Sequence, residues 1–93
     1  MMRKIQAKEL LDVLENALRY KKKRRKYLLC FEEMVGECEI VGVSQEQLIA
    51  LEDLACDFAY YTTDEQSRRE DPALFGDEEM EKRIRETFTK GNW

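Results

Sequence analysis

Acidic side chains recur at helical spacing in the middle of this chain. Successive residues of an α-helix are rotated by about 100°, and on that geometry four side chains lie within about 40° of Asp53. These four are Glu46, Asp57, Tyr60 and Asp64. Three more acids, Glu65, Glu70 and Asp71, follow shortly after them. The pattern indicates either a binding surface for something basic or the solvated face of an ordinary amphipathic helix.

Residue types that support common catalytic and metal sites are missing. The sequence has no histidine, which removes the usual general base and the commonest metal ligand. It contains no phosphate-binding Gly-rich loop, no nucleophile elbow and no CxxC pair. The many acids bring some carboxylates together in any fold, so proximity alone is not evidence of catalysis. We therefore expect no enzyme activity, no catalytic residues, no metal and no cofactor.

Charge is distributed unevenly along the sequence. Residues 1–26 carry ten Lys and Arg against three acids, a balance of +7, whereas residues 27–93 carry six against seventeen, a balance of −11. Together these give the net charge of −4. The acidic part would repel phosphates, so we expect a cationic protein as the partner and no direct contact with nucleic acid.

The basic part contains six consecutive cations, from Lys21 to Lys26. A helix continued through them would place Lys21, Lys22 and Arg25 on a buried stripe, where unpaired charge is costly. We therefore expect a break, kink or short loop at 19–24. The run is either a patch for nucleic acid or a membrane surface, or a solvated connector that pairs with the acidic part of the protein. We favour the connector.

Hydrophobic periodicity predicts four helices, at residues 5–18, 25–38, 45–61 and 77–90. Ser44 and Gln47 form a capping box at the start of the third helix. In the fourth, acids occupy the first turn and cations the later turns, as the helix dipole favours. Residues 64–70 are expected to form a further helical turn, with Thr63 as N-cap, or a structured loop. No segment alternates as a strand does, and 39–43 is interpreted as a connector. The predicted fold is all-α, a small antiparallel four-helix bundle that makes residues 1–93 a single helical domain.

The hydropathy of the sequence and its use of cysteine indicate the cellular compartment of the protein. No apolar run approaches the roughly 18 residues that span a bilayer, and none matches a signal-peptide core. Cys30, Cys38 and Cys56 are an odd number without paired spacing. We expect reduced thiols that act as small core residues in an intracellular, cytoplasmic protein with no membrane contact.

A family resemblance rests on residues 54–71 and on the acid-rich helix start at 77–85. Leu51, Leu54, Asp57, Ala59 and Tyr60 occupy places comparable to those of a known helix end that reads like Leu-x-x-Leu-Phe-x-Asp-x-Asp-Ala-Tyr. That pattern belongs to small helical immunity proteins of the colicin D immunity type, including relatives paired with contact-dependent growth inhibition toxins. The C-terminal half resembles this family. Phe58 stands where a second Asp is expected, Thr62 and Thr63 stand where a proline is usual, and the basic run is not a family feature.

The resemblance implies a bacteriocin immunity function. Such proteins bind and silence a ribonuclease toxin that cuts tRNA, and carboxylates set in its cationic cleft imitate phosphates. The partner would be a basic nuclease toxin domain, bound by a monomer in a 1:1 complex. The residues expected to contact it are Asp53, Asp57, Tyr60, Asp64 and Glu65, with Glu70 and Asp71 as outer candidates. Tyrosine is enriched among binding hot spots, which makes Tyr60 the expected anchor.

Two other classes of function remain open from the sequence. A regulatory helical module would use the cations from Lys21 to Lys26 to bind nucleic acid. A homodimeric structural or adaptor bundle would instead bury a helix face against a second copy.

Overall fold

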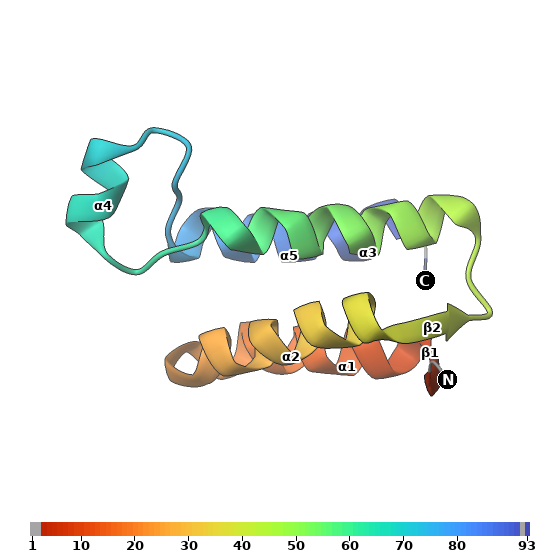
Figure 1. The fold of residues 1–93 in the computed structure, drawn as a ribbon. Coiled ribbons are helices and arrows are strands. Elements are labelled where there is room, and N and C mark those ends of the chain that lie inside the picture. Colours follow the sequence, from red (N-terminus) through yellow and green to blue (C-terminus); the bar gives the residue numbers. More distant parts are fainter. Residues whose placement is uncertain (1–2, 92) are drawn as a thin grey trace.

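The computed structural model describes residues 3–91 and 93. Its strands are β1 (Arg3–Gln6) and β2 (Cys38–Val41). Its helices are α1 (Ala7–Arg19), α2 (Arg24–Glu37), α3 (Gln45–Asp57), α4 (Glu65–Glu70) and α5 (Asp77–Gly91) (Figure 1). Short 3₁₀ turns occupy Lys21–Lys23 and Phe58–Tyr60. The protein is therefore mainly helical, as predicted.

The four longer helices lie side by side, and consecutive ones run in opposite directions (Figure 1). α1 packs against α2, and α3 packs against α5. The two pairs meet where α2 contacts α3 and α1 contacts α5. Residues 61–76, called the lobe below, carry α4 and project beyond one end of the long helices (Figure 1). The long helices thus form the rigid support from which the lobe extends.

The core consists of the apolar stripes that helical periodicity predicts. Each long helix contributes residues three or four positions apart, which lie on the same side of a helix. These buried residues include Leu10 and Leu14 of α1, Leu28 and Phe31 of α2, Leu51 and Leu54 of α3, and Met80 and Ile84 of α5. Phe75 is also buried and carries the end of the lobe back to the core.

The two strands were not predicted. β1 and β2 pair in parallel, with Arg3 opposite Cys38 and Gln6 opposite Val41, and Ile5 is only 2% exposed. The predicted helix at 5–18 therefore begins at Ala7, and the presumed connector at 39–43 contains most of β2. Strands of four residues are too short to reveal a period of two, and their pairing joins segments far apart in the sequence.

The predicted break in the basic run is confirmed. α1 ends at Arg19, and a 3₁₀ turn at Lys21–Lys23 separates it from α2. The basic run is not entirely the solvated connector that we favoured, because Arg24 at the start of α2 is buried and only 1% exposed.

The predicted third helix is too long. Ser44 caps α3 as expected, accepting a hydrogen bond from the Gln47 N–H at 3.1 Å. The α-helix ends at Asp57 rather than near Tyr61, because Tyr61 adopts an extended conformation and pairs with Phe75. The lobe does contain a further helix, α4, but its N-cap is Asp64 rather than Thr63.

The cysteines are not the core residues that we expected. Cys30 and Cys56 are exposed and Cys38 is partly buried, and all three thiols are free in the described part of the chain. Both exposed cysteines lie on the outward sides of their helices, away from the stripes of Leu28 and Leu51. In the described ranges, no helix is long and apolar enough to cross a membrane.

Candidate protein-binding surface

The outward side of α3 carries acids with no cation beside them in the sequence. Between Lys26 and Arg68 the chain has ten acidic residues and no Lys or Arg. On α3, Glu46, Glu52 and Asp53 are exposed, and none forms an ion pair within residues 3–91 and 93. This part of the predicted acidic face is therefore free to meet a partner.

Asp57 is held by α5. Its carboxylate lies 3.2 Å from a guanidinium nitrogen of Arg83, which also bonds Glu79 at 3.1 Å. The same guanidinium sits 4.2 Å from the centre of the Phe75 ring. These contacts tie the end of α3 to α5 and to the base of the lobe. They also neutralise part of the charge that sequence analysis assigned to partner binding.

Tyr60 lies just beyond α3, in the 3₁₀ turn, and its side chain is 49% exposed. Its backbone is fixed, because the Tyr60 carbonyl accepts a hydrogen bond from the Phe75 N–H at 2.9 Å. Phe58, two residues earlier, is buried and anchors the same turn. Tyr60 is thus an exposed aromatic ring on a well-supported backbone.

Asp64 has a structural role at the start of α4. Its carboxylate accepts hydrogen bonds from the Ser67 hydroxyl at 2.7 Å and from the Gln66 N–H at 3.1 Å. These bonds, the one from Ser67 first, hold the pKa of Asp64 below its usual value. The side chain stays exposed and charged.

The remaining predicted acids also lie in the lobe, and each has a local partner. Glu65 pairs with Arg69 at 3.0 Å, one helical turn away. Glu70 accepts a hydrogen bond from the Gln66 side chain at 3.4 Å. Asp71 accepts one from the Ala73 N–H at 2.9 Å, which shapes the turn after α4. Exposed pairs of this kind contribute little stability and leave the carboxylates accessible.

The predicted acids therefore form two groups instead of one continuous stripe. Asp53, Asp57 and Tyr60 follow α3 and its end, whereas Asp64, Glu65, Glu70 and Asp71 belong to the lobe. The angle counted for Asp64 assumed an unbroken helix, and the extended residue at Tyr61 interrupts it.

Arg24 connects the basic run to α5. Its guanidinium donates to Asp77 at 2.7 Å, to Glu81 at 2.6 Å and to the Ala17 carbonyl at the end of α1 at 2.8 Å. Burial lowers the pKa of Arg24, but the hydrogen bonds and charges of Glu81 and Asp77 outweigh burial and raise it overall. One cation of the run thus pairs with the acidic half of the chain, as the connector hypothesis requires.

Tyr61 joins the base of the lobe to this network. Its hydroxyl donates to Asp77 at 2.7 Å. Burial, followed by the hydrogen bond to Asp77, raises the pKa of Tyr61 to about 12. The hydrogen bond from Tyr61 is the main cause of the lowered pKa of Asp77, although partial burial opposes it and Arg24 assists. Asp77 therefore stays ionised and fixes the lobe against α2.

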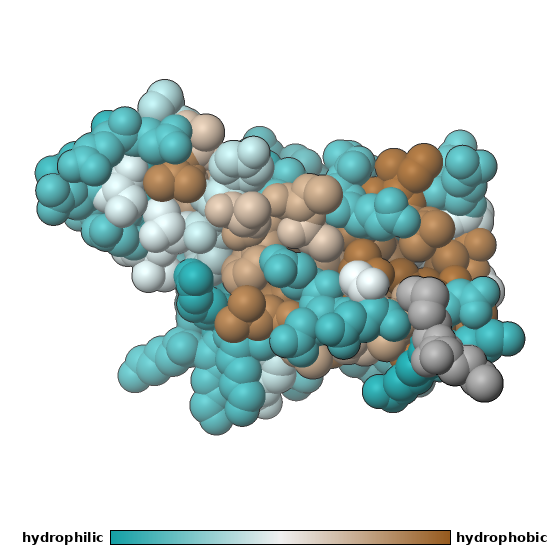
Figure 2. Space-filling model, viewed as in Figure 1, coloured by the Kyte–Doolittle hydropathy of each residue, from teal (hydrophilic) through white to brown (hydrophobic). Residues whose placement is uncertain are grey.

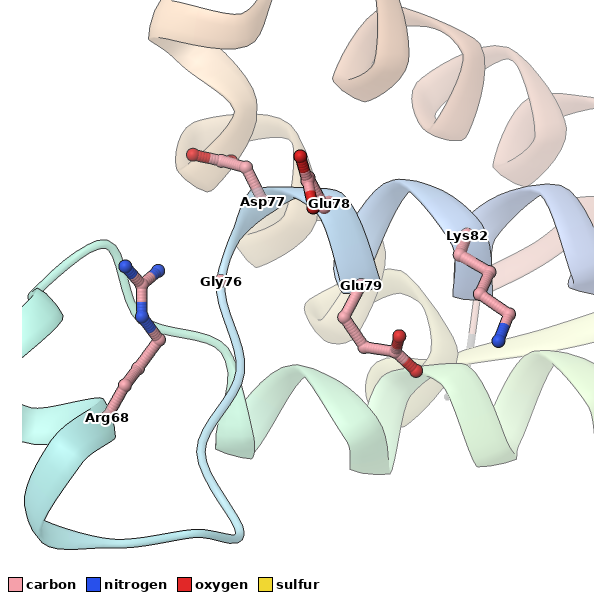
Figure 3. A pocket seen from close by; sticks show the side chains of 6 residues that line it. All are labelled: Arg68, Gly76, Asp77, Glu78, Glu79 and Lys82. Carbon is pink, nitrogen blue, oxygen red and sulfur yellow. The ribbon is translucent and has the colours of Figure 1, made fainter.

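An open hollow of about 620 Å³ lies between the lobe and the start of α5 (Figure 3). It is lined by Arg68, Gly76, Asp77, Glu78, Glu79 and Lys82. Arg68 reaches from α4 toward Gly76, while Asp77 points away from Glu79 and Lys82. Its lining is a mixture of cations and carboxylates and includes no Ser, Thr or Cys. Within the described residues, no group of three or more Cys, Asp or Glu side chains is placed to hold a metal ion.

The other cations of the basic run stay on the surface. Lys22, Lys23, Arg25 and Lys26 are exposed and form no ion pair in the part of the chain that the structure describes. Lys21 lies 3.8 Å from Glu81. Most of the run is therefore available to an anionic ligand.

Three apolar residues are exposed that the sequence patterns did not single out. Leu29 of α2 and Ile49 of α3 are 45% and 48% exposed, and Cys56 of α3 is exposed as well. The sequence did contain a signal of their exposure, because each residue lies off the helical stripe that periodicity assigns to the core.

Comparison with known proteins yields no relative: no family model, curated protein or solved structure matches this chain.

Proposed function

We propose that this chain is a cytoplasmic immunity protein that binds and neutralises a cognate bacterial ribonuclease toxin, one that cuts tRNA. Its acidic helix face would occupy the cationic cleft in which the toxin binds RNA. The scaffold would be the small antiparallel bundle of α1, α2, α3 and α5, acting as a monomer in a 1:1 complex.

One observation carries this proposal. Glu46, Glu52 and Asp53 line the outward side of α3, and the 41 residues from 27 to 67 contain no Lys or Arg to neutralise them. The lobe adds Asp64, whose lowered pKa keeps it charged. A rigid helix that presents uncompensated carboxylates suits a cationic protein surface and repels polyanions.

The charge expected of the partner is complementary to this surface. A nuclease that grips tRNA needs a cationic cleft, because phosphate contacts supply much of its affinity. Complementary charge also speeds association toward about 10⁸ M⁻¹s⁻¹ at low salt. Fast association suits an inhibitor that must reach the toxin before the toxin reaches its tRNA.

The test begins with the reading frame adjacent to this gene. Its product should be a nuclease that kills cells unless this protein is co-expressed, and the two purified proteins should form a 1:1 complex that no longer cleaves tRNA. A variant carrying Glu46→Lys and Asp53→Lys should lose protection and bind at least about a hundredfold more weakly, since like charges across an interface cost several kcal/mol.

The matched control carries Asp12→Lys and Glu15→Lys on the exposed side of α1. It changes the net charge by the same amount at a distance from α3, and it should protect fully. Equal loss in both variants, or an adjacent gene without nuclease toxicity, contradicts the proposal.

The alternative of a nucleic-acid-binding module is favoured by the exposed cations Lys22, Lys23, Arg25 and Lys26. It predicts that the protein retards RNA or DNA in a gel and that the shift weakens when Lys22, Lys23 and Lys26 become Ala. The immunity proposal predicts no such shift.

A further inference from the structure

The outward side of α3 and its 3₁₀ extension is apolar as well as acidic. Ile49 and Tyr60 are 48% and 49% exposed, and Cys56 between them is exposed too. A spacing of seven residues places Ile49 and Cys56 on the same side of α3, and Tyr60 follows them in the 3₁₀ turn that continues the helix. In Figure 2, patches of apolar surface alternate with hydrophilic ones along α3 on the viewed face of the molecule. These three residues are called the α3 ridge below.

Acids border the ridge closely. Glu52 and Asp53 lie between Ile49 and Cys56 in the sequence, and Glu46 lies one turn before Ile49. All three acids are exposed and form no ion pair inside the described structure. An apolar row with a charged border has the composition of a binding interface, in which a dry centre is surrounded by a polar rim.

Tyr60 is prepared for such a role. Its carbonyl is held by the Phe75 N–H at 2.9 Å, and the Thr62 N–H bonds the Phe75 carbonyl at 2.9 Å on the other side of Tyr61. A side chain that projects from a fixed backbone loses less conformational freedom on binding. Tyrosine is also among the residues that most often dominate binding energy.

Charge identifies the occupant. A second copy of this chain would set Glu46, Glu52 and Asp53 against the same acids, and like charges facing each other disfavour association. An anionic lipid surface is repelled for the same reason. A protein with an apolar pocket rimmed by Lys and Arg is complementary to both parts of this surface.

We propose that the α3 ridge is the buried centre of the interface with the cationic toxin domain, and that the surrounding acids form its rim. This inference rests on the proposed immunity function and deepens it. The ridge sets how long the complex lasts, because its contacts form only after docking, whereas the acids set how fast the two proteins meet. If the acids acted only by imitating phosphates, the α3 ridge would have no role in binding.

The experiment measures association and dissociation rates with the nuclease domain encoded beside this gene, made catalytically inactive. Ile49→Ser and Tyr60→Ser should each raise the dissociation rate about 30-fold or more, the effect of a hot spot, and change the association rate less than about twofold. Asp53→Asn with Glu52→Gln should slow association and reduce its dependence on salt.

Tyr20→Ser is the matched control. Tyr20 is 46% exposed, nearly the same as Tyr60, but it lies beside the basic run at the end of α1. This variant should dissociate as the unaltered protein does. Circular dichroism should show that every variant keeps its helical content, because the substituted side chains are exposed.

Each outcome decides between the proposals. If the unaltered protein inhibits the nuclease and the Ile49→Ser and Tyr60→Ser complexes dissociate no faster than the Tyr20→Ser complex, the ridge proposal is wrong and the immunity function stands. If the protein forms a dimer on sizing chromatography that Ile49→Ser abolishes, the ridge belongs to a homodimer and the proposal is wrong. If the unaltered protein does not bind the nuclease at all, both proposals fail.

Discussion

Replacing Arg24 by Met tests whether the buried guanidinium holds the molecule together. Arg24 joins the end of α1, the start of α2 and the first turns of α5 through Ala17, Asp77 and Glu81. Methionine keeps much of the side-chain volume but cannot donate a hydrogen bond. The substitution therefore removes the charge and its bonds while leaving only a small cavity.

The magnitude follows from what Arg24→Met leaves behind. Removing one partner of a buried ion pair costs about 3–5 kcal/mol, because the other charge stays buried without compensation. Glu81 is only 17% exposed and loses its nearest cation, but Lys21 at 3.8 Å and Arg85 at 3.9 Å still pair with it, which places the cost at the lower end of this range. Asp77 is 51% exposed and is largely solvated. The Ala17 carbonyl also loses its donor, worth about 1 kcal/mol. We expect a total loss of about 3 kcal/mol in the free energy of unfolding.

Urea denaturation at neutral pH measures this loss, followed by circular dichroism and by the fluorescence of Trp93, the only tryptophan. With a denaturant slope of about 1 kcal/mol per molar urea for a small domain, the midpoint should fall by about 3 M. Lys22→Met is the control, since it removes the same charge from the same run at an exposed position, and it should change stability by less than about 0.5 kcal/mol.

A loss for Arg24→Met no larger than that for Lys22→Met would refute the reasoning. A second variant separates charge from packing: adding Glu81→Gln to Arg24→Met should recover part of the lost stability, because it removes a largely buried carboxylate that has lost its nearest cation. No recovery would mean that Arg24 acts through packing alone.

Three further predictions concern single groups. The pKa of Asp77 is lowered in the folded state, so its contribution to stability is present above the ordinary carboxyl pKa and is lost as the pH falls through the lowered value; Asp77→Asn should flatten the acid limb of the stability profile, and an unchanged limb would contradict this. Ser44→Ala removes the acceptor of the Gln47 N–H and should cost about 1 kcal/mol in urea denaturation, and a neutral result would show that the cap contributes nothing. Gly42 has a φ of 74°, so Gly42→Ala should lower the melting temperature. Gly36 lies in α2 with open space around it, so Gly36→Ala should raise the melting temperature, because alanine removes the cost of about 0.5–1 kcal/mol that glycine has in a helix. A change of the same sign in both variants would contradict the reasoning.

The helical periodicity of the sequence was sufficient to place the long helices. Leu10 and Leu14, or Met80 and Ile84, are spaced so that a helix puts them on one side, and each of them is buried. The start of α3 at Ser44 followed from a capping box, a signal that lies within four residues. The break after Arg19 followed from the cost of placing cations on the apolar stripe.

The candidate surface was predictable only in part. The sequence located the acids Asp53, Asp64 and Glu70 and the tyrosine at position 60, but whether they bind a toxin stays a prediction. It could not show that Asp57 is held by Arg83 of α5, nor that Ile49, Cys56 and Tyr60 all stay exposed. Those facts depend on which helix packs on which side of α3.

By itself, the sequence determined where the long helices lie, which sides of them are apolar, and how charge is divided between the two halves. These properties depend on neighbours within a few residues, so local spacing reports them. The tertiary structure alone decided that β1 pairs with β2, that α3 ends where Tyr61 meets Phe75, and that Arg24 is buried against Asp77 and Glu81. Each of these joins residues distant in the sequence, and the free energy of such a contact depends on the packing that brings both partners out of water together.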